Sequence, residues 1–162
     1  MDPAKVAVII NIKVPETVKQ LRSLLGHTGY YRRFIRNHAK IIAPLEKLLW
    51  KSKQFMWINE CTNDLNTLKE KLASAPILVH PNWEKQFHVH IDASSIALGV
   101  VLAQPGETFF DHPVYFASRK LPTVERNYTT TEREALDMAY SLQKFHNYLL
   151  GGMFKFFTEH ST

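Results

Sequence analysis

The chain has 162 residues, of which 45% are hydrophobic and 22% charged, and its formal net charge is +5. These values are ordinary for a folded protein with one good core or two small ones. The single cysteine, Cys61, excludes an internal disulfide and a cysteine-based zinc site, and it fits a reducing compartment. No secretory signal and no apolar run of membrane-spanning length occurs, so we expect an intracellular protein, cytoplasmic or nuclear.

The charge is divided unevenly along the chain. Residues 1–80 carry 13 Lys and Arg against 6 Asp and Glu, whereas residues 81–162 carry 7 against 9. A basic half followed by a slightly acidic half suggests an arm that binds a polyanion beside a site that collects carboxylates.

The first half has the apolar spacing of helices. Asp2-Pro3 is a typical helix start and predicts a short helix to about Ile10, and a second helix is predicted from Val14-Pro15 to a stop at Gly26. Further helical segments are predicted at 30–35, at 41–50 and from a cap at Asn59 to a point before Pro76.

After Pro81 the apolar period changes to that of strands. We expect strands at 86–92, 96–104 and 112–118, then a helix at 130–149, and a last strand at 153–158. The apolar face predicted for this helix consists of Ala135, Met138, Ala139, Leu142, Phe145 and Leu149. The pattern indicates an α+β protein, or layered α/β, with a helical segment at 1–78 and a mixed sheet with a packed helix at 79–162.

Acidic residues occur at three places that such a sheet could bring together. Asp92 ends the first strand, Glu132 and Glu134 open the helix, and Glu159 ends the last strand. Converging carboxylates repel one another, and a divalent cation such as Mg²⁺ reverses that repulsion. The alternative for Asp92 is a turn, because Asp-Ala-Ser-Ser is good turn chemistry. Three separated acids occur in most proteins, so spacing alone does not decide.

Five stretches of the chain carry a resemblance to a known family. They are VPETVKQLRSLLGHTGYYRRFIRNHAKIIAPL, LASAPIL, HIDASSIALGVVLAQ, HPVYFASRKLPTVERNYTTTEREALDMAYSLQKFHNYLLG and FKFFTEH. In this order they resemble the Pol polyprotein of gypsy-type LTR retrotransposons, from the reverse-transcriptase thumb into the RNase H domain. The resemblance implies a helical thumb or connection followed by an RNase H-like domain that is C-terminally truncated here.

The resemblance implies a metal-dependent endonuclease that cuts the RNA strand of RNA–DNA hybrids. Its catalytic, metal-binding acids fall on Asp92, Glu134 and Glu159, with Mg²⁺ as the cofactor and Mn²⁺ as the alternative. The family pattern places the helix acid directly before the apolar Ala135-Leu136, which selects Glu134. The residues themselves leave Glu132 open, because Glu132 and Glu134 flank the apolar stripe on opposite sides.

Two departures from the family pattern put the activity in doubt. Thr158-Glu159-His160 stands where the family has T-D-H, and the extra methylene moves the carboxylate by roughly 1.5 Å, more than octahedral Mg²⁺ tolerates easily. The chain also stops at Thr162, whereas family members continue with further elements that bear a fourth acid. We expect cleavage to be weak or lost.

Basic residues supply the expected nucleic-acid contacts. We expect Arg32, Arg33 and Arg36 in GYYRRFIRN, and Arg119 with Lys120 after the third strand, to bind phosphates of a hybrid or duplex. The alternative is a solvated basic face over a core of Tyr31, Phe34 and Ile35. His88 and His90 lie on one strand face, but no cysteine or spaced carboxylate–histidine set accompanies them, which argues against zinc.

Two functions follow from these observations. The first is a metal-dependent endoribonuclease. The second is a non-catalytic nucleic-acid-binding or protein-interaction module from a decayed or domesticated retroelement. For either, we expect nucleic acid as a partner, no membrane, and another Pol segment or a second copy covering the open part of the sheet.

Overall fold

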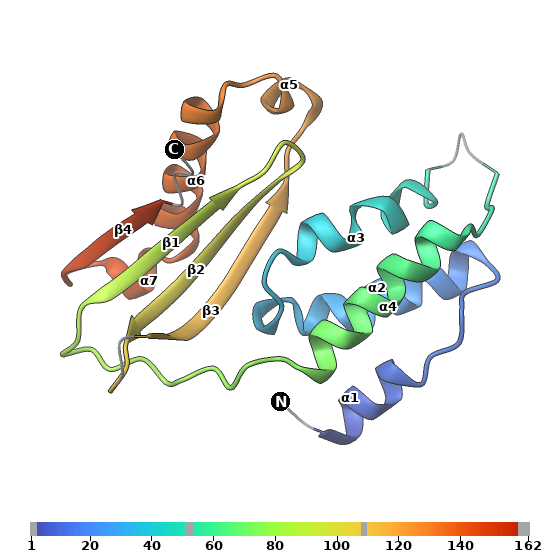
Figure 1. Ribbon diagram of the computed structural model, residues 1–162, viewed down its shortest axis with the longest axis horizontal. Coiled ribbons are helices and arrows are strands. Elements are labelled where there is room, and N and C mark those ends of the chain that lie inside the picture. The colour runs from blue at the N-terminus through green and yellow to red at the C-terminus, as the bar shows by residue number, and fades with distance from the viewer. Residues whose placement is uncertain (1–2, 51–53, 108–109, 159–162) are drawn as a thin grey trace.

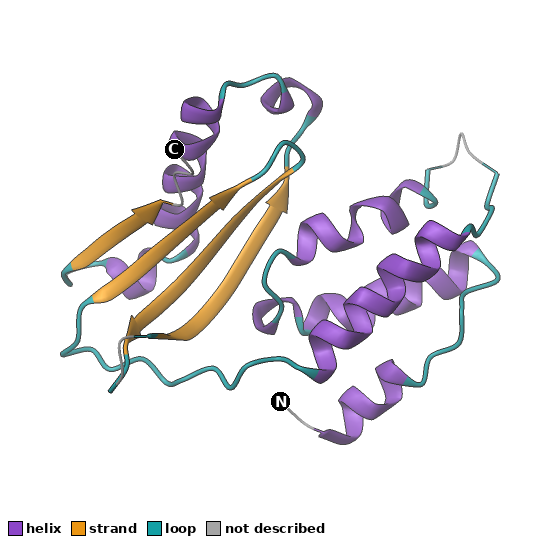
Figure 2. Ribbon diagram, viewed as in Figure 1, coloured by secondary structure: helices purple, strands orange, loops and turns teal. Residues whose placement is uncertain are grey.

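The computed structural model describes residues 3–50, 54–107 and 110–158, and its two halves differ in secondary structure (Figures 1 and 2). The first half is helical and consists of α1 (Pro3–Ile10), α2 (Val18–Tyr30), the 3-10 turn η1 (Arg32–Phe34), α3 (His38–Lys47) and α4 (Asn59–Ala73). The second half contains β1 (Phe87–Ala93), β2 (Ala97–Pro105), β3 (Asp111–Lys120), α5 (Thr123–Arg126), α6 (Thr130–Lys144), α7 (His146–Leu149) and β4 (Phe154–Thr158). The predicted mixed α and β architecture is confirmed. No helix in these ranges is long and apolar enough to cross a membrane.

The four strands form one mixed sheet in the order β3-β2-β1-β4. β1 and β2 pair antiparallel, as do β2 and β3, whereas β4 runs parallel to β1 with Thr158 opposite Ile91. A parallel partner needs a crossover connection, and the segment from α5 to α7 supplies it. The carboxyl ends of β1 and β4 therefore meet at the same end of the sheet.

Strict alternation along β1 separates its two faces. Phe87 and Val89 are buried in a core with Phe145 and Leu149, at the end of the α6–α7 segment. The intervening side chains, beginning with His88, leave the sheet on the opposite face. Figure 1 shows α6 on one side of the sheet and the helical half on the other. The α6–α7 segment thus covers one face of the sheet, and the helical half packs along β3 and β2.

The helical half builds its own core from leucines at helical spacing. One cluster consists of Leu21, Leu24, Leu45, Cys61 and Leu65, and a second of Ile9, Tyr31, Ile35, Leu68 and Leu72. Each such side chain contributes roughly 1.5–3 kcal/mol when fully buried. Of the aromatic segment in GYYRRFIRN, Tyr31 and Ile35 are buried while Arg32 and Arg33 are exposed, as the core alternative predicted.

Two helix predictions were wrong. The predicted stop at Gly26 does not occur, because α2 runs on to Tyr30, and burial of Leu24 and Thr28 outweighs the roughly 1 kcal/mol cost of a helical glycine. The predicted apolar face of α6 is also rotated. Ala135, Ala139 and Leu142 are exposed, whereas Phe145 and Leu149 are buried as predicted. Asp137 and Ser141 are buried although neither was part of the predicted face.

The helical half is held to the sheet by polar contacts as well as by packing. The Ala39 backbone N–H at the start of α3 donates to Ser118 Oγ of β3 at 2.9 Å. Lys120 of β3 forms an ion pair with Glu46 of α3. These contacts bring the turn between η1 and α3 onto the sheet face that carries Asp92.

Candidate active site

Asp92 lies near the carboxyl end of β1 and faces the helical half. Its Oδ2 accepts a hydrogen bond from Asn37 Nδ2 at 2.8 Å, and the Arg36 guanidinium lies 3.5 Å from the same oxygen. The Asp92 side chain is 33% exposed and that of Arg36 is 48% exposed. A turn residue would need no such partners, so the long-range contacts favour a positioned carboxylate over the turn alternative.

The backbone around Asn37 explains how these partners reach Asp92. Asn37 has φ 58° and ψ 30°, in the left-handed region that asparagine tolerates better than most residues, and it directly precedes α3. Gly99 of β2 lies opposite Asp92 in the register, and a Cβ at Gly99 would overlap Asn37 Oδ1. The asparagine amide therefore needs the glycine to reach the Asp92 carboxylate.

The two glutamates at the start of α6 have different surroundings. Glu132 closes a capping box, in which its carboxylate accepts the Thr129 backbone N–H at 2.7 Å and the Thr129 hydroxyl at 2.9 Å. These hydrogen bonds lower the pKa of Glu132, which is exposed. Glu134 is half-buried and lies one turn before Asp137 on the side of α6 that faces the sheet. Helix capping therefore accounts for Glu132, and the assignment of Glu134 as the helix acid stays a prediction.

Asp137 is an acid that the sequence analysis did not select. It is completely buried, and its pKa is raised to about 7, first by desolvation and further by the negative charge of Asp92. The Gly99 backbone N–H and the Arg119 guanidinium partly oppose this rise. Even so, neither carboxylate oxygen has a hydrogen bond of good geometry within the part of the chain that the structure describes. Its position inside the run Ala-Leu-Asp-Met-Ala was the signal, because an acid there is costly to bury.

The structure describes two of the three predicted acids. Asp92 lies on β1 and Glu134 on α6, and, in addition to burial, the charge of Asp92 raises the pKa of Asp137, one turn after Glu134 on the same helix. The amino end of α6 and the carboxyl end of β1 lie at the same end of the sheet (Figure 1). Glu159 lies outside the described residues, so its part in the site stays a prediction.

The predicted basic contacts are largely engaged within the protein. Arg119 forms a bidentate ion pair with Glu125, with Nη1–Oε2 at 2.7 Å and Nη2–Oε1 at 3.2 Å. Its guanidinium also lies over the Tyr140 ring. Lys120 pairs with Glu46, and Arg36 with Asp92. Arg32 and Arg33 are exposed on η1, with Arg33 over the Phe34 ring at 4.9 Å. These two arginines present the more accessible positive charge.

A second polar cluster lies on the same sheet face as Asp92. His88 Nδ1 and His90 Nε2 each lie 2.7 Å from Oδ2 of Asp111, at the start of β3. Burial alone would raise the pKa of Asp111, but the hydrogen bonds from both imidazoles lower it. The sequence analysis found no carboxylate to accompany these histidines, and Asp111 supplies one. That part of the argument against a zinc-type site was wrong, because strand pairing joins residues more than 20 positions apart.

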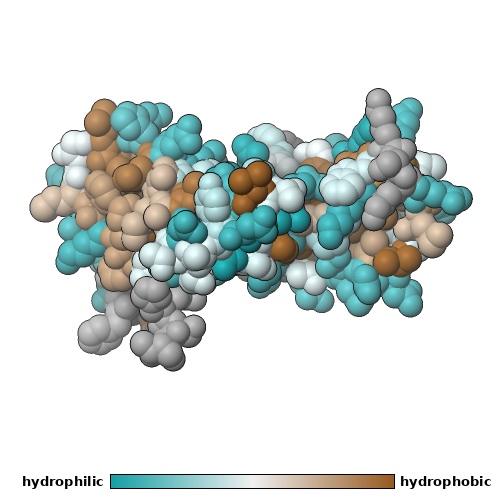
Figure 3. All heavy atoms as spheres, turned by 90° about the horizontal axis from the view of Figure 1, so that it is seen from above, coloured by the Kyte–Doolittle hydropathy of each residue, from teal (hydrophilic) through white to brown (hydrophobic). Residues whose placement is uncertain are grey.

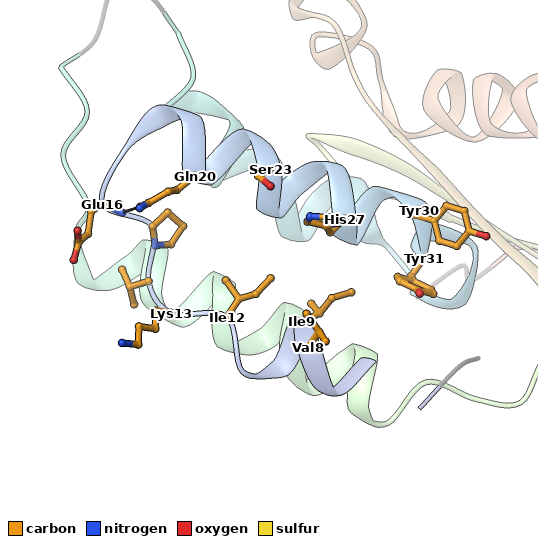
Figure 4. A pocket seen from close by; sticks show the side chains of 12 residues that line it. Val8, Ile9, Ile12, Lys13, Glu16, Gln20, Ser23, His27, Tyr30 and Tyr31 are labelled. Atoms are coloured by element: carbon orange, nitrogen blue, oxygen red, sulfur yellow. Dashed lines mark hydrogen bonds between the residues drawn. The ribbon is translucent and has the colours of Figure 1, made fainter. Parts of the chain in front are cut away.

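The helical half also carries an open groove of about 1060 Å³ between α1 and α2 (Figure 4). Ile9, Ile12 and Tyr31 line its floor, and Lys13 and Glu16 lie toward one end of it. Neither Asp92 nor Glu134 lines this groove. It is therefore separate from the chemistry around Asp92.

Comparison with known proteins identifies the family and the fold of this chain. Residues 57–156 match the family model of the RNase H-like domain found in reverse transcriptase. The chain is 38% identical over 160 residues to the retrovirus-related Pol polyprotein from transposon 297 of Drosophila melanogaster, covering 98% of this chain and 15% of that protein. It is 32% identical over 154 residues to the transposon Tf2-3 polyprotein of Schizosaccharomyces pombe, covering 94% of this chain and 12% of that protein.

Solved structures show the same fold. The foamy viral protease-reverse transcriptase, in complex with an RNA/DNA hybrid and with dsDNA, matches all of this chain with a TM-score of 0.84 at 25% identity. The chain covers 22% and 34% of those two chains. The chain spans about a sixth or less of the length of the fly and yeast polyproteins. It belongs to the family of RNase H-like domains found in the reverse transcriptases of retrotransposon Pol polyproteins.

Proposed function

We propose that this chain forms a divalent-metal-dependent endoribonuclease site for RNA–DNA hybrids, with Asp92, Glu134 and Glu159 as the ligands. The proposal rests on the position of the Asp92 carboxylate. Asn37 and Arg36 hold it near the carboxyl end of the central strand β1. The helix α6 begins at the same end of the sheet (Figure 1). The similar foamy viral protein with a bound RNA/DNA hybrid supports the substrate.

The chemistry of the donors fits a hard divalent cation. Asp92 and Glu134 offer carboxylate oxygens, which Mg²⁺ prefers. Mn²⁺ is the alternative, because it is more forgiving of the longer Glu159 side chain. A bound divalent ion would supply Lewis-acid stabilisation of the phosphodiester and activation of water.

The residues of the chain have distinct parts in this proposal. Asn37 orients Asp92 through its hydrogen bond. Arg36 offsets the Asp92 charge, and it would turn to a substrate phosphate when a cation takes its place. Arg32 and Arg33 lie one turn earlier and would contact the backbone of the same duplex.

Cleavage of a labelled RNA–DNA hybrid tests the nuclease, first with Mg²⁺ and then with Mn²⁺. We expect slow cleavage that Asp92→Asn abolishes and that Glu159→Asp accelerates. A misplacement of about 1 Å can cost on the order of a hundredfold in rate, and the shorter side chain should recover part of that. Absence of cleavage in both ions, from folded wild-type protein and from Glu159→Asp, would refute the enzyme.

The alternative is a non-catalytic module that binds duplexes through η1. It predicts salt-dependent binding that Asp92→Asn leaves unchanged and that the double change Arg32→Gln and Arg33→Gln weakens, with the salt slope falling by about 0.9 per lost phosphate contact. Lys19→Gln on α2 is the matched control, since it removes an exposed positive charge elsewhere. No binding at low salt would exclude this module.

We further propose that the sheet half packs against more Pol sequence. Seen from above, apolar atoms gather at the end that holds β4 and α6 (Figure 3). Leu150 and Met153 in this half are 73% and 76% exposed. We also propose that the chain divides into segments 1–78 and 79–162 and that the protein is intracellular. Sedimentation over a range of concentrations tests the main competing occupant, a second copy of this chain, which would give a mass that rises with concentration.

A further inference from the structure

The cluster of His88, His90 and Asp111 has the geometry of a metal site outside the proposed active site. Its three ligand atoms all lie within 4.8 Å of one another, and it is the only group of three or more His, Cys, Asp or Glu side chains that meets this condition in the described ranges. Two imidazole nitrogens face a single carboxylate oxygen at 2.7 Å each.

The scaffold around the cluster is rigid. His88 and His90 lie in the middle of β1, which is paired on both sides, by β2 and by β4. Ala103 lies opposite His88 on β2 and presents only a methyl group between β1 and β3. Phe157 of β4 covers the imidazoles, with ring centroids 4.8 Å from His88 and 4.9 Å from His90. Ligands held on paired strands keep their spacing better than ligands on loops.

The ligand types select the kind of ion. Two imidazoles and one carboxylate suit borderline transition ions, above all Zn²⁺, whereas Mg²⁺ prefers oxygen alone. Zinc bonds of about 2.0–2.2 Å place neighbouring ligand atoms roughly 3.3 Å apart. The 2.7 Å separations would therefore open by little more than half an ångström, which side-chain rotation can supply.

The position of the cluster separates it from the proposed nuclease site. His90 is two residues before Asp92 on the same strand face, a spacing of roughly 7 Å along a strand. The two ions of a two-metal catalytic site lie only about 4 Å apart. An ion bound at the histidines is therefore too far from Asp92 to act as one of such a pair. The two sites also differ in their ligands. The cluster offers two imidazole nitrogens and one carboxylate, whereas the proposed nuclease site offers only carboxylates.

We infer that His88, His90 and Asp111 bind one zinc-type divalent ion, which joins β1 to the start of β3 across β2. Water completes the coordination on the exposed side, since the His90 side chain is 37% exposed. The ion stabilises the strand that ends at Asp92. The inference does not depend on nuclease activity.

Titration of the whole chain with Zn²⁺ tests the inference, with Co²⁺ as a spectroscopic probe. We expect one equivalent of tight binding, a Co²⁺ spectrum of nitrogen and oxygen ligands, and a rise in Tm with Zn²⁺ that Mg²⁺ does not reproduce. His90→Gln and Asp111→Asn should each weaken binding by at least about 100-fold, because loss of a supporting group alone costs up to that much. His112→Gln, an exposed neighbour of Asp111, is the matched control and should bind as the wild type does.

NMR of the wild-type imidazoles keeps the test independent of variant folding. Zn²⁺ should shift the ring signals of His88 and His90 and leave those of the other six histidines in place. Equal binding by His90→Gln, or shifts confined to other histidines, would overturn the inference. Unchanged Zn²⁺ affinity in Asp92→Asn would show that the two sites are distinct, and a loss there would contradict the separation argued above.

Discussion

The replacement Asp137→Asn should make the protein more stable at alkaline pH relative to the wild type. The reason lies in the burial of Asp137, whose pKa is about 7 in the folded protein against 3.8 in the unfolded chain. As pH rises from about 4 to about 7, the unfolded chain loses this proton and the folded protein keeps it. Ionisation is thus disfavoured in the folded protein, and stability falls over this interval.

The size of the effect follows from the same two values. A difference of about three pKa units corresponds to about 4 kcal/mol at 1.36 kcal/mol per unit. Relaxation of the site reduces this, so we expect roughly 2–4 kcal/mol. Asparagine keeps the shape and has no charge to bury, although its buried amide adds a cost that does not vary with pH.

Urea unfolding at several pH values between 4 and 8 measures this prediction. The informative quantity is the difference in unfolding free energy between Asp137→Asn and the wild type, because contributions from other titrating groups cancel in it. This difference should rise from pH 4 to pH 7 and stay level above. Gln143→Ala changes an exposed residue that does not titrate and should give a flat difference. A flat difference for Asp137→Asn as well would refute the assignment of a buried, protonated carboxyl.

Three further predictions concern single contacts. Burial, with a smaller effect from Arg32, lowers the pKa of His38 from 6.5 to about 4, so the contribution of His38 to stability should fall by about 3 kcal/mol as pH drops from 6.5 to 4. The difference in unfolding free energy between His38→Leu and the wild type in urea should therefore rise by that amount over this interval. Thr129→Ala breaks the capping box with Glu132 and should cost about 1 kcal/mol in thermal unfolding, with hybrid binding unchanged; a cost near zero would contradict the cap. Asn37→Ala removes a hydrogen bond to the charged Asp92 and should cost roughly 1.5–3 kcal/mol, whereas Asn37→Asp, which sets two carboxylates together, should cost more unless Mg²⁺ is added.

Much of the fold could be predicted because its signals are local. Alternation of Phe87, Val89 and Ile91 with polar residues specified β1 and its buried face, and the structure has both. The orientation of α6 could not be obtained in this way, because the hydrophobic count gave weight to Ala135 and Ala139, which bury little surface. The positions that α6 buries, Asp137 and Ser141, are polar and carry no hydrophobic signal, and the Ser141 hydroxyl donates to Met138 O at 2.7 Å.

The candidate site was only partly accessible to sequence reasoning for a related reason. A strand-end aspartate such as Asp92 is visible as a break in an apolar pattern. Its partner Asn37 is 55 residues away and reaches it through a left-handed turn beside a glycine. The pairing of His88 with Asp111 likewise depends on a register between strands that no local period encodes.

The contacts of Asp92 also couple the two halves of the chain. Arg36 and Asn37 belong to the helical half, so the charge of one strand-end carboxylate determines how firmly the turn before α3 is held on the sheet. A cation bound to Asp92 competes with Arg36, because both are positive and both need the same oxygens. Cation binding and release of Arg36 are then linked, and reciprocity requires that a phosphate which draws Arg36 away strengthens the cation site. Under the proposed function the backbone of a bound hybrid is such a phosphate, so the cation at Asp92 should bind most tightly when the hybrid is present.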